Sequence, residues 1–485
     1  MRLSSLVTDA PTGDPEITGV TADSRKVRPG FLFAALPGST VDGRKFIPAA
    51  IDAGAAAVLA PEDVRGLAVP VVHAADPRRA YALAAAAFWG AQPATCVAVT
   101  GTNGKTSVAT FCRQIFARLG HTAASMGTLG VTVSAPGQPD RQITPPGLTT
   151  PDAADVAELL ARMAGEGVTH LALEASSHGV DQRRLDGVKL TAAGFLNLTQ
   201  DHLDYHGTMG VYRAAKLRLF ETLLPRGATA VLNADSDQYP VFAAAAVVAG
   251  QTVLSTGSAG DGIRVVDRVL ASDGQRLTLS HAGTTTTVQL PLAGAFQADN
   301  ALVAAGLCIA AGEAPADVFA ALEHLKGAPG RLQRVGAREG GGEAYVDYAH
   351  TPDGLETVLM ALRPHAEGRL LVVFGAGGDR DRTKRPLMGE IAARLADVAI
   401  IADDNPRSED PAAIRAEVQA GAPNALNIGG RREAIRAGVA MLTAGDVLVV
   451  AGKGHEQGQT IAGVTHPFDD VVETAAALGL EAAHV

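Results

Sequence analysis

Short apolar runs rich in β-branched residues recur along this chain, and each ends in a loop of glycine and polar residues. Examples are CVAVT before GTNGKT, VTHLALE before ASSHG, and AAGFLNLT before QDHLDYHG. Such runs, separated by helical stretches, predict buried parallel strands in a doubly wound α/β sheet. Ligands of such sheets lie beyond the carboxyl ends of the strands. We therefore expect the polar loops to converge on one crevice.

Breaks in this rhythm divide the 485 residues into three expected domains. Residues 1–91 hold a strand-like GVTADSRKV, the apolar run FLFAALPG, a helical stretch near residues 46 to 58, and the helix DPRRAYALAAAAFWG, which predict a small N-terminal α/β domain. Residues 92–328 carry the central P-loop sheet, mostly parallel, with antiparallel strands expected over residues 252 to 290 before a helix near Asp299. Residues 329–485 restart the strand-then-loop rhythm and predict a C-terminal Rossmann-like α/β domain.

Composition narrows the classes of partner. Apolar residues make up 47% and charged residues 19%, which favours a folded globular chain. The net charge of -10 and the lack of a Lys/Arg-rich block exclude nucleic acid as an expected partner. Three cysteines without a CxxC pair give no zinc-ligand spacing and no disulfide framework. No apolar run reaches a membrane span, so we expect a cytoplasmic protein with no membrane span.

The sharpest local signal is VAVTGTNGKTSVATFCRQIFARLG, which reads as a strand, a glycine-containing loop and a helix that opens at Lys105. Backbone N–H groups of such a loop hold phosphates, Lys105 can reach the β- and γ-phosphates of ATP, and Thr106 can ligate Mg²⁺. The loop does not meet the GxxxxGK[ST] spacing, because Val99 stands at the first glycine position. An ordinary glycine turn between a strand and a helix is the alternative.

The compact TGTNGKT loop resembles that of the Mur ligases and the related folylpolyglutamate and cyanophycin synthetases. Further motifs match, in order, those of the diaminopimelate-adding members of the Mur ligase family across nearly the whole chain. These are DSRKV (23–27), TTP (149–151), EASSHG (174–179), QDHLDYHG (200–207), YRAAKLRLF (212–220), GRLQ (330–333), DYAHTPDGL (347–355), GAGGDRDRTKRPLM (375–388), DNPR (404–407) and GKGHE (452–456).

The resemblance implies an ATP-dependent amide ligase that acts in cytoplasmic peptidoglycan precursor synthesis. Its substrates would be ATP, meso-diaminopimelate and UDP-N-acetylmuramoyl-L-alanyl-D-glutamate, joined through an acyl phosphate, and a monomer is expected. A lysine-adding ligase of the same family is one alternative. A nucleotide-dependent switch without ligase activity is another, but the arginine-rich loops GGDRDRTKRP and DNPR argue against it.

The same resemblance assigns the site residues. Glu174, His202 and Lys216, with Thr106, would hold Mg²⁺ and, with Lys105, form the catalytic set; Lys216 would act as a CO₂-derived carbamate. Taken alone, Glu174 and His202 would be ordinary polar residues at strand ends, and Lys216 a solvated helix lysine. The ATP contacts would be Gly101, Thr102, Asn103, Gly104, Lys105, Thr106, Ser107, Asn300, Arg331 and Asp347.

The resemblance also assigns contact residues to the two other ligands, UDP-muramoyl-dipeptide and diaminopimelate. UDP-muramoyl-dipeptide would contact Ser24, Ser39, Thr40, Val41, Thr149, Thr150, Ser176, Gln182 and Arg184, residues that taken alone would be turn or cap groups. Diaminopimelate would contact Arg380, Asp404, Asn405, Pro406, Arg407, Gly452 and Glu456. Two positions depart from the family pattern: Gln297 replaces an asparagine, and Gln333 stands where an acidic residue is frequent.

Overall fold

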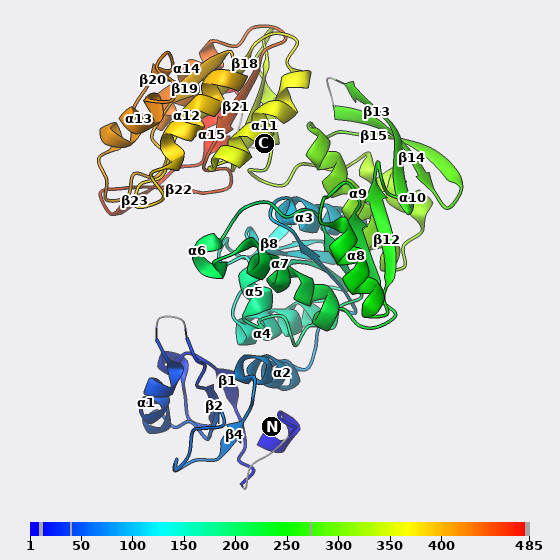
Figure 1. Cartoon of the computed structure of the whole chain (residues 1–485), viewed down its shortest axis with the longest axis vertical. Helices are drawn as coiled ribbons and strands as arrows, with labels where there is room; N and C mark the ends of the chain where they lie inside the picture. Colours follow the sequence, from blue (N-terminus) through cyan, green and yellow to red (C-terminus); the bar gives the residue numbers. More distant parts are fainter. Residues whose placement is uncertain (9–12, 39–40, 272–273, 481–485) are drawn as a thin grey trace. The chain divides into compact units, whose positions relative to one another are not determined.

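The computed structural model describes residues 1–8, 13–38, 41–271 and 274–480. Two compact units divide the chain (Figure 1). The first comprises Met1–Val265, Ser280–Thr284 and Asn300–Ala321, and the second comprises Val266–Leu279, Thr285–Asp299 and Leu322–Val485. None of the helices in the described residues is long and apolar enough to cross a membrane.

The chain begins with a four-stranded parallel sheet in the order β1-β2-β3-β4. Its elements are β1 (Gly19–Thr21), the 3₁₀ helix η2 (Ser24–Lys26), β2 (Phe31–Ala34), α1 (Ile47–Asp52), β3 (Ala57–Ala60), β4 (Val71–His73) and α2 (Pro77–Trp89). Asp76 caps α2 by accepting the Arg79 N–H, and Gly90 follows its last residue, as expected from DPRRAYALAAAAFWG.

An eleven-stranded sheet follows, in the order β15-β14-β13-β12-β11-β10-β5-β9-β6-β7-β8. Its strands are β5 (Thr95–Thr100), β6 (Ala123–Gly127), β7 (Gly130–Ser134), β8 (Arg141–Thr144), β9 (His170–Glu174), β10 (Ala192–Phe195), β11 (Thr229–Asn233), β12 (Thr252–Gly257), β13 (Ile263–Ala271), β14 (Gly274–His281) and β15 (Thr284–Leu290). The strands from β12 to β6 in this order pair in parallel, which confirms the expectation of a mostly parallel sheet.

The helices of this region are α3 (Lys105–Arg118), α4 (Ala153–Gly165), α5 (Ser177–Asp181), α6 (Leu203–His206), α7 (Met209–Arg218) with a π-helical continuation over Leu219–Leu223, α8 (Tyr239–Val248), α9 (Ala295–Ala310) and α10 (Pro315–Leu322). A continuous core of leucine, valine, phenylalanine and alanine side chains lies between helices and sheet. Phe195 and Phe242 stack in it with ring centres 3.7 Å apart.

The position of β5 explains where the polar loops meet. The strand lies between β9 and β10, with Val99 opposite Glu174 and Thr100 opposite Phe195. The chain leaves β9 on one side of β5 and enters β10 on the other, which makes this edge a topological switch point of the sheet. The loops after these three strands therefore emerge side by side.

The C-terminal sheet has the order β16-β17-β21-β18-β19-β20, with all pairs parallel except β16–β17. Its elements are β16 (Gln333–Ala337), β17 (Glu343–Asp347), α11 (Pro352–Leu362), β18 (Leu370–Phe374), α12 (Lys384–Leu395), β19 (Val398–Ile401), α13 (Pro411–Gln419), β20 (Leu426–Asn427), α14 (Arg431–Ala440), β21 (Val447–Ala451), the hairpin β22 (Gly458–Ile461) and β23 (Val464–Pro467), and α15 (Asp470–Leu478). Buried apolar side chains cover both faces, as in other α/β sheets.

Four local expectations were wrong. The run 252–257 pairs in parallel with β11 and belongs to the main sheet, so it is no antiparallel insertion. The helical stretch expected to residue 58 ends at Asp52, because Ala57 and Val58 lie in β3. GVTADSRKV is a strand only over Gly19–Thr21, and the 3₁₀ helix η2 interrupts it. The helix expected near Asp299 begins at Ala295. The local sequence pattern does not predict these pairings and bounds, because they depend on which strands pair with one another in the fold.

Between α14 and α15, Arg431 and Asp470 form a fully buried ion pair with two hydrogen bonds of 2.7 and 2.6 Å. We expect Asp470→Ala to lower the free energy of unfolding of this unit by about 3–5 kcal/mol, because the Arg431 charge stays buried without its carboxylate. Urea denaturation measures the change. The matched control is Arg432→Ala, which removes the exposed pair with Glu473 on the same two helices and should change little. Equal losses in both variants would contradict the argument.

Candidate functional site

The loop between β5 and α3 has the geometry of a phosphate-binding strand–loop–helix. Gly104 caps α3 with φ of 89°, in the left-handed region, and a Cβ there would lie 2.2 Å from Oδ1 of Asn300. Lys105 begins the helix, and its Nζ donates to the carbonyls of Gly101 (2.9 Å) and Thr102 (2.8 Å). Thr106 and Ser107 are buried in the first turn. The structure thus brings Asn300 to the loop that the sequence assigned to ATP.

The chain that continues β10 holds this loop in place. The Thr102 N–H donates to the Asn197 carbonyl (3.0 Å), and the Asn103 N–H donates to Oδ1 of Asn197 (3.0 Å). The Thr102 hydroxyl donates to the Thr199 carbonyl and accepts the Thr199 N–H. Two neighbouring strand ends are thereby locked together, and the loop N–H groups are oriented before any ligand binds.

Lys216 is buried, with only 1% of its surface exposed, so the idea of a solvated helix lysine is wrong. Its Nζ donates to the Gly101 carbonyl at 2.7 Å, the same oxygen that accepts from Lys105. Burial, followed by the positive charge of Lys105, holds the pKa of Lys216 well below its ordinary value. The side chain is therefore poised to be neutral.

Tyr212, the first residue of the YRAAKLRLF motif, contacts this site although the sequence assigned it no role there. Its ring centre lies 4.5 Å from Nζ of Lys216, one helical turn away, and its hydroxyl is 3.2 Å from Oγ1 of Thr102. Burial raises the pKa of Tyr212 to about 12, so the hydroxyl keeps its proton. The signal in the sequence was the i, i+4 spacing in YRAAK.

Glu174 lies at the carboxyl end of β9 and accepts the Thr128 N–H at 2.9 Å. A Cβ on Gly127 would lie 2.0 Å from Oε1 of Glu174, so only glycine leaves room for this carboxylate. The Thr128 hydroxyl donates to the other carboxylate oxygen at 3.4 Å and is hydrogen-bonded to the Thr149 hydroxyl at 2.9 Å. One network therefore contains Glu174 and Thr149, which the sequence assigned to metal and to the nucleotide sugar.

Thr150, Ser176, Gln182 and Arg184 form a second, connected network. The Thr150 hydroxyl lies 2.9 Å from that of Ser176, which caps α5 by accepting the Gly179 N–H. Arg184 donates to the Thr150 carbonyl (2.6 Å) and to Oε1 of Gln182 (2.7 Å). The structure thus brings together four of the residues assigned to UDP-muramoyl-dipeptide.

His202 is more exposed than the other assigned metal ligands. It has φ of 51°, and its Nε2 lies 3.4 Å from Oδ2 of Asp201. Its ring packs edge-on against His178 at 4.8 Å, and His178 contacts Tyr205 at 4.1 Å. A non-glycine residue in the left-handed region at a loop of this kind is typical of functional sites.

Ser24 lines a cavity of about 1220 Å³ in the first unit. Its walls include Thr18–Arg28, Phe46, Tyr81, Trp89 and Asp152. Aromatic faces with hydroxyl and charged groups suit a base with polar substituents. Ser39 and Thr40 lie outside the described residues, and Val41 is exposed. The aromatic residues of this cavity were not predicted from the sequence.

In the second unit, Asn405 and Glu456 are hydrogen-bonded at 2.7 Å. The buried Lys453 was not assigned to a site from the sequence. It donates to Oε2 of Glu456 (3.0 Å) and to Oδ1 of Asn405 (3.2 Å). Oδ2 of Asp404 is buried without a hydrogen-bond partner among the described residues, and it lies 2.4 Å from where a Cβ on Gly452 would stand. The DNPR and GKGHE loops, 48 residues apart in the sequence, therefore form one polar cluster.

Arg407 extends this cluster. It has φ of 54°, its backbone N–H donates to the Thr460 carbonyl (2.9 Å), and its Nη1 donates to the Gly378 carbonyl (2.7 Å). Arg380 is exposed, and its Nη1 lies 3.5 Å from the Asp379 carbonyl. Pro406 precedes Arg407, and its fixed φ stiffens the loop. The DNPR loop is thus held by the glycine loop after β18 and by β22.

Arg331 and Asp347 lie in a second cluster of this unit. The Arg331 guanidinium stacks on Tyr348 at 4.4 Å, and the Tyr348 ring also contacts His350 and His455. Asp347 accepts the Leu332 and Ala349 N–H groups, and burial raises its pKa to about 6.

The two departures from the family pattern have structural roles here. Gln297 donates to the Arg331 carbonyl at 3.3 Å, and Gln333 accepts the Gly330 N–H at 2.8 Å. Both amides thus fix the loop that carries Arg331.

Comparison with known proteins shows to which family the chain belongs. Residues 16–89 match the model "Mur ligase family, catalytic domain", residues 99–308 the Mur ligase middle domain, and residues 330–454 the Mur ligase glutamate ligase domain. The chain belongs to the Mur ligase family.

Two curated relatives share nearly its full length. A UDP-N-acetylmuramoyl-L-alanyl-D-glutamate--2,6-diaminopimelate ligase from Caulobacter vibrioides is 70% identical over 98% of each chain. One of the same name from Bradyrhizobium diazoefficiens is 53% identical over 99% of each chain. A solved structure of that ligase name is 35% identical, with a TM-score of 0.72 over 96% of this chain and 95% of the other.

His455, beside the assigned Glu456, gives a pH-dependent prediction. Burial lowers its pKa from 6.5 to about 4, so between these values the unfolded chain binds a proton that the folded chain does not. The stabilisation is present above pH 6.5 and is lost as the pH falls to about 4, by at most about 1.4 kcal/mol per pH unit. In His455→Gln, the free energy of unfolding should fall less steeply over this window than in wild type.

Urea denaturation from pH 4 to pH 7.5 measures both slopes. The control is His466→Gln, which changes an exposed histidine on β23 and should keep the wild-type slope. A His455→Gln slope identical to wild type would show that this ring protonates equally in both states.

Proposed function

We propose that this chain is the ATP-dependent ligase that adds meso-diaminopimelate to the D-glutamate of UDP-N-acetylmuramoyl-L-alanyl-D-glutamate. The observation that carries the proposal is the 70% identity, over 98% of both chains, with a relative of that name. Its partners are small molecules, and we place its work in the cytoplasm, as a monomer, during peptidoglycan precursor synthesis.

The chemistry follows from the weakness of a carboxylate as an electrophile. An oxygen of the D-glutamate γ-carboxylate attacks the γ-phosphorus of ATP, and the bond to ADP breaks, which leaves an acyl phosphate. The amine of diaminopimelate attacks the acyl carbon, loses a proton and expels phosphate. Lys105, at the head of α3, is placed to offset the charge on the transferred phosphoryl group. Asn197 and Thr199 hold the loop through Thr102 and Asn103, and the remaining N–H groups at the start of α3 would bind the phosphates.

The donor set near this loop suits Mg²⁺, which prefers oxygen ligands. Thr106 offers a hydroxyl and Glu174 a carboxylate, and we assign His202 as a further ligand. Bound Mg²⁺ would supply positive charge to the phosphate oxygens. Lys216 does not fit as an amine, because Mg²⁺ prefers oxygen over nitrogen ligands, whereas a carbamate on Lys216 would offer oxygen atoms.

We infer that Lys216 is carbamylated. Carbamate formation needs a neutral amine that attacks CO₂ and releases a proton. The burial of Lys216 and the nearby Lys105 charge favour that neutral amine. The product would place oxygen atoms beside the nucleotide loop, one turn of α7 from Tyr212.

The kcat of the Lys216→Ala variant should therefore be at least about a hundredfold lower than that of wild type. Added short carboxylates such as acetate or formate should restore part of this activity. The reason is that the free carboxylate fills the vacated oxygen position. Ligase turnover with increasing formate measures the effect.

The matched control is Lys105→Ala, which removes the other lysine that donates to the Gly101 carbonyl. It should be equally inactive and should gain nothing from formate, since its role needs positive charge. Rescue of both variants, or of neither while both stay folded by circular dichroism, contradicts the carbamate.

Selection of the amino acid is assigned to the DNPR–GKGHE cluster of the second unit. Meso-diaminopimelate differs from L-lysine by one distal carboxylate, and the guanidinium of Arg407 can grip a carboxylate bidentately. The Gly378 carbonyl fixes the Arg407 head group, and Pro406 fixes the loop before it. Arg380 is a second cation, and Glu456 with the Gly452 backbone would take the distal ammonium; Asp404 and Asn405 shape this pocket.

In wild type, kcat/KM should favour meso-diaminopimelate over L-lysine, and Arg407→Ala should reduce that preference about ten- to a hundredfold. One charge-assisted hydrogen bond contributes roughly 1.5–3 kcal/mol, which corresponds to that range. Product masses from ATP, UDP-muramoyl-dipeptide and each amino acid give the rates.

Arg394→Ala is the control, because Arg394 pairs with Glu356 on the surface of α12 and should leave the preference unchanged. Equal use of both amino acids by wild type would favour a lysine-adding or broad ligase. An unchanged preference in Arg407→Ala would remove Arg407 from the selector role.

A further inference from the structure

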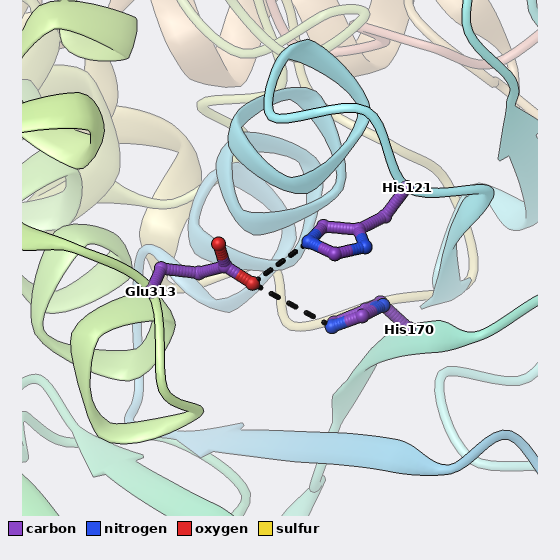
Figure 2. Close-up of side chains that lie close together, drawn as sticks. All are labelled: His121, His170 and Glu313. Atoms are coloured by element: carbon purple, nitrogen blue, oxygen red, sulfur yellow. Dashed lines mark ion pairs between the residues drawn. The ribbon is translucent and has the colours of Figure 1, made fainter.

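Three potential metal ligands meet at the edge of the central sheet that lies opposite the nucleotide loop: His121, His170 and Glu313 (Figure 2). Nε2 of His121 lies 2.9 Å and Nε2 of His170 lies 3.7 Å from Oε1 of Glu313. The two imidazole rings lie nearly face to face, 3.9 Å apart and tilted by 34°. Figure 2 shows both rings directing a nitrogen toward the same carboxylate oxygen.

The three residues come from separate elements that the fold fixes. His121 follows the end of α3, where its backbone N–H donates to the Phe116 carbonyl. His170 is the first residue of β9, and the Phe116 ring packs against its imidazole at 4.6 Å. Glu313 lies in the turn between α9 and α10, with its N–H donating to the Cys308 carbonyl. Only 12% of the His170 side chain and 17% of the Glu313 side chain are exposed.

Nδ1 of His170 has a hydrogen-bond partner of its own. The Thr169 hydroxyl lies 2.9 Å from this nitrogen and 3.2 Å from the Thr122 carbonyl oxygen. When Nδ1 carries the ring proton and donates to this hydroxyl, Nε2 has a lone pair that can ligate a cation beside the Glu313 carboxylate.

We propose that His121, His170 and Glu313 form a binding site for a divalent transition-metal ion of the zinc class. Two imidazole nitrogens and one carboxylate oxygen are a donor set that Zn²⁺ takes, with a fourth position left for water. Ligand atoms on a tetrahedral zinc lie roughly 3.3 Å apart, given bonds of about 2.0–2.1 Å. The distances of 2.9 and 3.7 Å bracket that value, so small side-chain rotations admit the ion. The bond from Nδ1 of His170 to Thr169 is the outer contact that orients a ligating histidine.

This site is separate from the one assigned to Mg²⁺. His170 and Glu174 are the two ends of the five-residue strand β9, which places them roughly 13 Å apart at about 3.3 Å per residue. The ligand chemistry also differs, because nitrogen donors favour zinc-class ions over Mg²⁺. An ion here would join the end of α3, the start of β9 and the α9–α10 turn, and so brace the central domain.

The test is titration of the full-length protein with ZnCl₂ by isothermal calorimetry, in a buffer without chelating groups and with excess Mg²⁺ to occupy oxygen-rich sites. Wild type should bind one zinc in this background and gain in Tm. Glu313→Gln and His170→Gln should each weaken that binding at least about tenfold and lose the gain in Tm. His466→Gln, an exposed histidine on β23, is the matched control and should behave as wild type. Cys308→Ala tests the nearby buried thiol and should also bind zinc normally.

The position of the bound zinc ion is measured separately, by anomalous diffraction at the zinc edge from a crystal of the protein. A peak within bonding distance of both Nε2 atoms supports the site. Absence of zinc binding by wild type, unchanged binding by Glu313→Gln with an unaltered fold, or a peak only at other residues would overturn the proposal. The metal-free Tm of each variant distinguishes lost binding from lost folding, and Glu313→Gln keeps the side-chain shape.

Discussion

The side-chain nitrogens of two lysines, Lys105 and Lys216, donate to one carbonyl oxygen, that of Gly101, and much of the central site depends on this arrangement. The oxygen can accept from both because Gly101 directly follows β5, in the middle of the sheet, while Lys105 and Lys216 approach from α3 and α7. Two like charges at one buried point favour the neutral form of the more deeply buried group. That condition makes Lys216 different from every surface lysine of the chain.

The same strand end organises the neighbouring networks. β9 and β10 flank β5, so Glu174 and the chain through Asn197 and Thr199 emerge beside the loop. Thr128 is hydrogen-bonded both to Glu174 and to the Thr149 hydroxyl, and so couples the residues assigned to metal and to the nucleotide sugar. Hydrogen bonds to neighbouring elements therefore position both the loop and Glu174.

The C-terminal unit is stabilised by buried charged side chains. Lys453 is fully buried yet bonded to Asn405 and Glu456, which ties the DNPR and GKGHE loops into one cluster. Beneath it, the buried Arg431–Asp470 pair anchors α14 to α15, and Arg431 also donates to the Ala451 carbonyl at the end of β21. Buried charges are costly unless they are paired, so these ion pairs fix the geometry of the loops that they support.

The sequence by itself determined the parallel α/β class, the β5–loop–α3 unit with Lys105 at its helix start, and the motifs that led to the family. These are local signals, written in periodicity, glycine placement and short spacings. Only the tertiary structure decided that 252–257 joins the main sheet, that Lys216 is buried, that Tyr212 links it to Thr102, and that Lys453 joins the DNPR cluster. It alone brought together His121, His170 and Glu313, which are 49 and 143 residues apart along the chain. Such contacts depend on strand order and helix packing, which join residues distant in sequence and leave no local pattern to read.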